Sequence, residues 1–320
     1  MSNIQYKPSI AYTLALLAHL CYCSQNYFIK QAQRNLTPAQ VQYFSFLQLG
    51  IYTYFIAPYR KVPLNYKNPK GNKLLLIRSL IGMANTYVFF SSLALIPLSE
   101  ITVICMVSPI LTAAMSPFFF NEKFERVTII NGALSIIGVA FIAKPSFIFG
   151  NSINIEYSDG RTLGLILAIV STFLGSTIPI LIKSCGSITH PIAMSSYFGF
   201  ITAFLTPIAM LMQGKLQDFT LLDARNLILS GMLGTIAHIS MSTSFQYGEA
   251  GKIALLQYSQ IIFAFVYDIL IDNRHPDDYS VLGTAFILAG FFVLMYKTAK
   301  KSKEAAKSIN ENQKLIPLKT

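Results

Sequence analysis

The chain has 320 residues, of which 53% are hydrophobic and 12% are charged, and its formal net charge is +11. A water-soluble protein carries roughly 25% charged residues, because its surface needs charge for solubility, so this composition excludes a soluble domain. It also excludes a disordered chain, and four cysteines in this length exclude a disulfide scaffold. We therefore predict a protein embedded in a membrane.

A helix needs about 20 mostly apolar residues to cross a bilayer. Ten segments meet this requirement: 10–30, 38–58, 74–95, 97–120, 124–143, 161–183, 190–212, 226–247, 250–271 and 279–297. The first segment is too long for a signal peptide and lacks a small-residue cleavage site. The segments also lack the strand-length alternation of a membrane β-barrel. The predicted fold class is an all-α membrane protein with ten transmembrane helices.

The basic residues predict the orientation of these helices. If the N-terminus is cytoplasmic, the cytoplasmic segments hold 17 Lys and Arg residues and the opposite side holds 7. Cytoplasmic loops carry an excess of these residues, so both termini are predicted to be cytoplasmic. The net charge is then a topology signal, and nucleic acid is not an expected partner. The basic tail 298–320 is interpreted as a solvated segment, with contact to anionic lipid as the alternative.

The two halves of the chain are similar in pattern. Residues 77–144 align with 229–296 at a constant offset of 152 without a gap, and Gly82 pairs with Gly234. Each half has five spans, so two tandem halves must lie in the membrane with opposite orientation. Secondary transporters are built from such inverted repeats, with the substrate near the midplane between the halves. The expected organisation is a cytoplasmic N-terminus 1–9, a first repeat 10–145, an extracytoplasmic linker 146–160, a second repeat 161–297 and the cytoplasmic tail 298–320.

Polar side chains within the spans form stripes at helical spacing, as expected for helices that line a hydrated pathway. Cys105 and Ser108 of the fourth span correspond, at the same offset of 152, to Gln257 and Gln260 of the ninth. The alternative for each such residue is a hydrogen bond to a neighbouring helix. The predicted substrate-binding residues of the cavity are His19, Asn26, Gln48, Arg78, Asn85, Ser108, His238, Ser242, Gln257 and Gln260.

Three of these candidates are ionisable. His19 and His238 lie near the middles of their spans and are candidates for proton coupling, because histidine titrates near neutral pH. Arg78 is the only arginine within a span and suits an anionic substrate, although a cation near a helix end also reaches the interface by snorkelling. The sequence contains no P-loop, zinc-protease or serine-hydrolase motif, and no metal, cofactor or catalytic residue is predicted.

Several local features resemble the EamA-type repeat of the drug/metabolite transporter superfamily. They are the turn LALIPLSE, the pair Ser108-Pro109, Glu122 in FFFNEKF, a glycine-rich fifth helix ending in AKP, and LLQYSQIIFAFVYDILID in the second half. The likeness covers roughly 10–297 and is greatest to the eukaryotic G-like members of solute carrier family 35. It implies a ten-helix transporter with both termini cytoplasmic, a central cavity built from spans 1–4 and 6–9, and peripheral spans 5 and 10. The sequence departs from the family pattern at Arg274, which occupies the position of Glu122 in the second half.

The favoured function is a secondary-active transporter of a small organic metabolite. A cavity rich in His, Asn, Gln, Ser and Tyr favours a polar, neutral or anionic solute over a bare cation. The alternatives are a non-transporting membrane scaffold and a lipid-handling membrane enzyme, for which the charged turn 272–278 is the one candidate cluster. The expected surroundings are the lipid bilayer of the plasma membrane or an endomembrane, and a homodimer is left open as an assembly.

Overall fold

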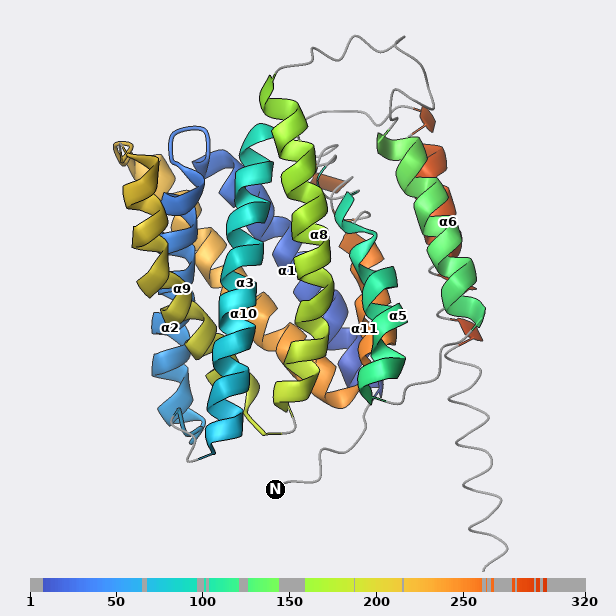
Figure 1. Ribbon diagram of the computed structural model, residues 1–320, viewed down its shortest axis with the longest axis horizontal. Helices are drawn as coiled ribbons and strands as arrows, with labels where there is room; N and C mark the ends of the chain where they lie inside the picture. The colour runs from blue at the N-terminus through green and yellow to red at the C-terminus, as the bar shows by residue number, and fades with distance from the viewer. Residues whose placement is uncertain are drawn as a thin grey trace, which may run out of the picture.

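The computed structural model describes residues 8–64, 68–96, 101, 104–120, 126–143, 159–186, 188–214 and 216–260, with parts of 263–297. The expected tail 298–320, Glu122, Arg274, the turn 272–277 and nearly all of the linker 146–160 lie outside these residues. The described elements are α1 (Pro8–Ala32), α2 (Pro38–Tyr59), α3 (Pro69–Leu95), α5 (Ser108–Phe120), α6 (Arg126–Ala143), α8 (Asp159–Gly186), α9 (Pro191–Gln213), α10 (Leu221–Tyr247), α11 (Ala250–Leu255), the 3₁₀ helix η1 (Leu256–Tyr258) and a helix at Val281–Gly290. Figure 1 shows them side by side as a helical bundle.

The helix starts follow from local chemistry. Pro38 and Pro191 occupy the first turns of α2 and α9, where the missing N–H leaves no bond unmade. Thr37 caps α2 by accepting from the backbone N–H of Gln40, whose side chain bonds back to Thr37. Such reciprocal bonds satisfy two of the free N–H groups that every helix start leaves. Most of the predicted spans appear as helices, and their ends lie within a few residues of the predicted ends.

The segment 97–120, predicted as one span, is not one continuous helix. Met106 and Val107 form a turn, and α5 begins at Ser108. Pro109 has no N–H, and its ring crowds the carbonyl four residues earlier, which favours a kink or a break at this point. The second half is also interrupted, because η1 follows α11 directly. α5 and α11, the helices beside these two interruptions, pack against each other.

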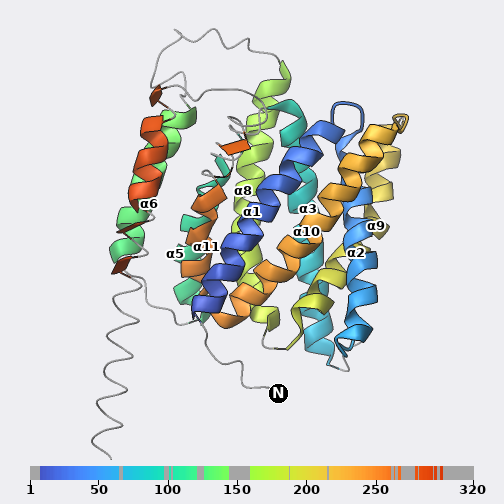
Figure 2. The ribbon, with the colours of Figure 1, turned by 180° about the vertical axis from the view of Figure 1, so that it is seen from behind.

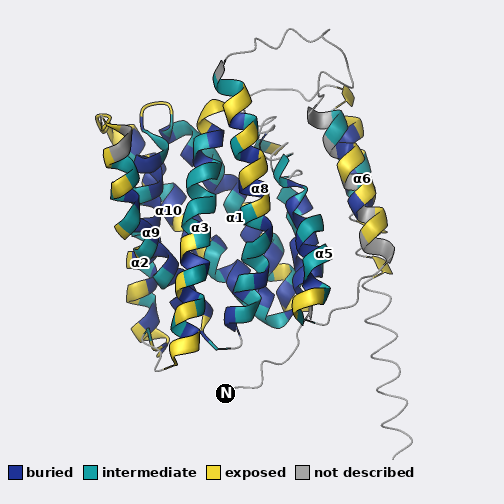
Figure 3. Cartoon of the chain, in the orientation of Figure 1, coloured by how far each residue is buried: buried dark blue, intermediate teal, exposed yellow. Residues whose placement is uncertain are grey.

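The outer surface is apolar. Within the described residues, four helices are long and apolar enough to cross a membrane, namely α3, α10 and the parts of α8 and α9 at Gly160–Gly186 and Pro191–Leu211. Large side chains such as Phe118 (87% exposed) and Phe204 (82% exposed) lie on the outside, and exposed residues follow the outer faces in Figure 3. Water would disfavour such a surface, whereas lipid tails are apolar. The chain is therefore an integral, multi-pass membrane protein.

The helices of the two halves interlock. α1 packs along α10, α2 along α9 and α3 along α8, as both views show (Figures 1 and 2). Smaller contacts join α3 to α9 and α10 to α2. Each of these pairs takes one helix from each half of the chain. The polar faces of both halves consequently meet in the interior of one bundle.

The crossing of α2 and α9 depends on two glycines. A Cβ at Gly199 would lie 2.4 Å from the backbone nitrogen of Gly50, closer than any real contact. Small residues of this kind let membrane helices approach closely and gain van der Waals contact.

α6 and the helix at Val281–Gly290 form a separate pair at the edge of the bundle (Figures 1 and 2). The rings of Phe141 and Phe286 stack at 5.8 Å. Gly138 lies against the backbone carbonyl of Gly283. These helices correspond to spans 5 and 10, for which the family resemblance implies a peripheral place.

We predict that Gly199→Ala lowers the stability of the protein by about 1–3 kcal/mol, because overpacking must push α2 and α9 apart. The matched control is Gly160→Ala, whose Cβ would meet Leu95 at an ordinary 3.5 Å. This control gains helix propensity without a clash and is expected to be neutral or slightly stabilising. Thermal melting of the detergent-purified variants measures both effects, and equal melting temperatures would contradict the close crossing.

Candidate functional site

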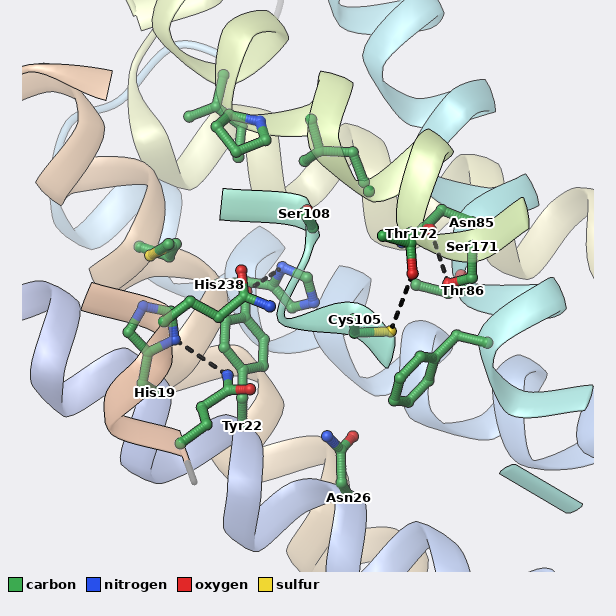
Figure 4. A pocket seen from close by; sticks show the side chains of 18 of the residues that line it. His19, Tyr22, Asn26, Asn85, Thr86, Cys105, Ser108, Ser171, Thr172 and His238 are labelled. Carbon is green, nitrogen blue, oxygen red and sulfur yellow. Dashed lines mark hydrogen bonds between the residues drawn. The ribbon is translucent and has the colours of Figure 1, made fainter. Parts of the chain in front are cut away.

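A cavity of about 230 Å³ lies inside the bundle. Its lining comes from α1, α3, α5, α8, α9 and α10, together with Cys105, Met106, Gln257 and Gln260 at the two interruptions. The polar and charged lining residues are His19, Tyr22, Gln25, Asn26, Arg78, Asn85, Thr86, Cys105, Ser108, Ser171, Thr172, His238, Gln257 and Gln260. Figure 4 shows His19, Tyr22 and His238 on one side of it and Asn85, Thr172 and Cys105 on the other.

Two buried apolar clusters contribute to the walls. One includes Phe90, Phe198 and Leu227, and the other includes Ile182, Met241 and Phe245. Each cluster joins residues of both halves, and each supplies residues that line the cavity. The polar interior is therefore bordered by two apolar contacts between the halves.

The structure places most of the predicted site residues in this cavity. The residues it brings together are His19, Asn26, Arg78, Asn85, Ser108, His238, Gln257 and Gln260. Cys105 and Ser108 lie there with their counterparts Gln257 and Gln260, so these parts of the fourth and ninth spans line one space.

Gln48 and Ser242, which were predicted as cavity residues, lie outside the lining of this cavity. The Gln48 amide donates to the carbonyl of Leu227 at 3.0 Å and lies against Gly231, so it ties α2 to α10. Ser242 lies one turn beyond His238 on α10 and is 1% exposed, but it is not among the residues that line the cavity. No residue of α2 lines the cavity, because α2 packs behind it against α9 and α10.

Two hydrogen bonds cross between the halves at the histidines. The Tyr22 hydroxyl lies 3.0 Å from Nδ1 of His238, and the Gln260 amide nitrogen lies 3.0 Å from Nδ1 of His19 (Figure 4). An amide nitrogen can only donate, so Nδ1 of His19 accepts and its ring proton sits on Nε2. This Nε2 is buried and has no hydrogen-bond partner within the described part of the chain.

Arg78 is the one permanently charged side chain among the described lining residues. It is 1% exposed, and its guanidinium carbon lies 4.0 Å from the centre of the Phe198 ring. The Phe198 ring also meets His238 edge to face at 5.2 Å. Cation–π attraction therefore holds the guanidinium against one wall.

The opposite wall consists of amide and hydroxyl groups. The Ser171 hydroxyl donates to Oδ1 of Asn85 at 3.1 Å, and this bond does not use the Asn85 amide nitrogen. Thr86 accepts from the Gln42 amide at 2.7 Å, so Gln42 of α2 supports the wall from behind.

Phe198 and Gln25 line the cavity but were not predicted from the sequence. A pair of glycines in the sequence could have indicated both positions. A Cβ at Gly82 would lie 2.7 Å from Phe198, and a Cβ at Gly234 would lie 2.5 Å from Gln25. Gly82 and Gly234 are the glycine pair that the 152-residue offset aligns, so each marks a place where a large side chain of another helix enters the interior.

The arrangement can bind a small polar solute. Amide, hydroxyl and imidazole groups line the space together with one cation, and none of the described lining residues is acidic. Within the same described residues, no three His, Cys, Asp or Glu side chains gather as metal ligands.

Comparison with known proteins gives a family match in both halves. The model of the EamA-like transporter family matches residues 9–144 and again 162–296. An uncharacterized membrane protein of Saccharomyces cerevisiae is 26% identical over 269 residues, which are 79% of this chain and 65% of the yeast protein. Solute carrier family 35 member G1 of Homo sapiens is 26% identical over 292 residues, covering 88% of this chain and 78% of the human protein. A solved crystal structure superposes with a TM-score of 0.74 at 14% identity over 92% of this chain and 99% of that chain, which shows a shared fold.

We predict that Gln48→Ala and Asn26→Ala separate structural from cavity-lining amides. Gln48→Ala removes a hydrogen bond between the halves and leaves the Leu227 carbonyl without it, so stability falls by about 1–2 kcal/mol. Asn26 lines the cavity and has no hydrogen-bond partner among the described residues, so Asn26→Ala is expected to change stability by less than about 0.5 kcal/mol. Melting curves of both variants test the assignment, and a larger loss for Asn26→Ala would refute it.

Proposed function

The chain belongs to the EamA-like transporter family, and on that premise we propose that it is a secondary-active transporter of a small organic metabolite. The cavity is the proposed substrate site, with Asn26, Asn85, Ser108, Gln257 and Gln260 contacting the solute beside the two histidines and Arg78. The observation that carries this proposal is a buried polar cavity built jointly by both family repeats.

The interrupted helices support transport through this cavity. Secondary transporters often form their sites from discontinuous helices near the bilayer midplane. Cys105 and Ser108 flank the turn before α5, and Gln257 lies in η1. These interruptions bring residues of both halves to the same space.

We further propose that the halves are inverted repeats with both termini in the cytoplasm. Exchanging the halves turns the pair α1 and α10 into α8 and α3, which also pack together. The same exchange turns α3 and α9 into α10 and α2. This exchange symmetry and the excess of basic residues on one side support the topology.

Alternating access needs contacts that open at one end while the other end closes. Near the end of α1 and the start of α10, the Asn35 amide donates to Asp223 at 3.3 Å. The Gln40 amide donates to the carbonyl of Gln217 at 2.9 Å. In the proposed topology this polar contact closes the extracytoplasmic end, and substrate release there requires it to break.

Transport is tested with the purified chain in liposomes. Binders are first found by thermal shift among amino acids, nucleotide sugars, S-adenosylmethionine, organic phosphates and organic acids, because a ligand stabilises the folded state it binds. At least one binder is expected to show saturable uptake, and the Asn26→Ala protein is expected to take it up at least five-fold more slowly.

The proposed gate is tested by cross-linking. A short bismaleimide link between Asn35→Cys and Asp223→Cys, with the four native cysteines changed to serine, is expected to stop uptake.

The singly substituted Asn35→Cys protein, treated with the same reagent, is the control and should keep its uptake. Uptake no faster than in protein-free liposomes for every binder would refute the transport proposal. Unchanged uptake after efficient linking would refute the proposed gate.

We propose His19 and His238 as the groups that couple transport to protons. Both line the cavity, and both bond a polar side chain of the other half, so gaining a proton would alter the contact between the halves. Uptake by His19→Ala and His238→Ala is expected to lose its dependence on an imposed pH gradient. An unchanged pH profile in both variants would remove this role.

A further inference from the structure

The side chain of Arg78 holds a charge that the described fold leaves without an anion. Arg78 is 1% exposed, and its Nε and Nη1 have no hydrogen-bond partner among the described residues. Phe198 covers one face of the guanidinium at 4.0 Å. Burying a cation without an anion or hydrogen-bond acceptors is unfavourable, and one aromatic face compensates only part of that cost. A negative group from outside the described residues would therefore stabilise the Arg78 guanidinium.

Lys30, a half-buried cation of the first half, is bonded in a way that Arg78 is not. Lys30 donates to the backbone carbonyls of Leu93 and Ile96, at the end of α3. Carbonyl groups that end a helix carry partial negative charge and suit a cation. Arg78 lies well inside α3, where the helix uses its own carbonyls.

Two acidic side chains of the described residues, Asp223 and Glu249, bond to groups other than Arg78. Asp223 accepts from Thr220 and Asn35 at the end of the bundle. Glu249 pairs with Lys252 at 2.9 Å. None of the described cavity residues is Asp or Glu, so a solute that enters the cavity meets Arg78 without a competing carboxylate.

We propose that the cavity binds a small monocarboxylate whose single negative charge pairs with the guanidinium of Arg78. The inference rests on the proposed function, because it assigns the substrate class of the same cavity. A guanidinium presents two parallel N–H groups that match the two oxygens of a carboxylate. Because Phe198 occupies a face of the guanidinium, its N–H edge is the part left to hold the carboxylate.

Charge balance selects one carboxylate. A dianion would bring a second negative charge into a space with one permanent cation, and that charge would stay unpaired. A zwitterion would add an ammonium group to a cavity whose described lining has no carboxylate. A monocarboxylate leaves the occupied cavity neutral.

The cavity also limits the size and polarity of the rest of the solute, beyond its carboxylate. Its volume of about 230 Å³ lies below the roughly 300–1,000 Å³ of pockets that hold drug-sized ligands, so it suits a smaller solute. Phe89, Met106 and Phe198 offer apolar contact, while Asn26 and Asn85 offer hydrogen bonds. Small aromatic or hydroxylated acids fit these limits.

The test measures thermal shifts of the full-length protein with matched probes. Benzoate is the monocarboxylate, benzamide its neutral counterpart, phenylphosphonate the dianion and phenylalanine the zwitterion. Benzoate is expected to raise the melting temperature in a saturable way, with half-saturation at a concentration at least ten-fold lower than for each of the other three. Arg78→Met is expected to weaken the benzoate response at least ten-fold.

Two controls separate binding from folding. Arg78→Met without ligand should melt no lower than the unsubstituted protein, because it removes an unpaired buried charge and keeps an apolar stem. Lys30→Met should melt lower, since two backbone carbonyls lose their donor, but it should keep the benzoate response. A destabilised Arg78→Met protein that still responds to benzoate, or equal responses to benzoate and benzamide, would overturn the inference.

Uptake measurements distinguish this inference from the transport proposal. Saturable uptake of a neutral or cationic solute that Arg78→Met leaves unchanged would refute the monocarboxylate assignment and preserve transport. Benzoate binding that depends on Arg78, without flux of any carboxylate, would preserve the anion site and refute transport.

Discussion

Lipid offers no hydrogen-bond partner, so a polar side chain that this chain carries into the membrane is stabilised when it finds a partner inside the bundle. The two halves meet this constraint together. Tyr22 bonds to His238 and Gln260 to His19, and each pair takes one residue from each half. The helices therefore interlock, α1 with α10 and α3 with α8, and the cavity forms where their polar faces meet. The position of the proposed substrate site follows from the packing of the repeats.

Much of this fold could be predicted because it depends on local chemistry and on hydropathy. The predicted segments 38–58 and 190–212 appear as α2 and α9, which begin at Pro38 and Pro191. Ser108 and Gln260, which the offset of 152 residues pairs, both line the cavity. The face that a membrane helix turns inward is harder to predict, because its neighbours decide it. Gln48 is a polar residue within a span, as a cavity residue would be, but its side chain bonds α10 instead. Phe198 is apolar, as a lipid-facing residue would be, but its ring lies over Arg78.

Arg78 shows how function can oppose stability within one cavity. The fold supplies an aromatic face and no anion from its described residues, so the empty site is less stable than a neutral one would be. A ligand with the complementary charge recovers that free energy when it binds. Between two apolar clusters, the same ligand would also bring the two halves together around itself. Binding and the movement of the halves would then be coupled.

In the proposed mechanism, one cavity between the halves serves both sides of the membrane in turn. Cys105 lines this cavity and can be made the single cysteine by changing Cys21, Cys23 and Cys185 to serine. In sealed vesicles, a membrane-impermeant maleimide added outside or trapped inside then measures access from each side. We expect Cys105 to be labelled from both sides. Labelling from one side alone, under every ligand condition, would contradict it.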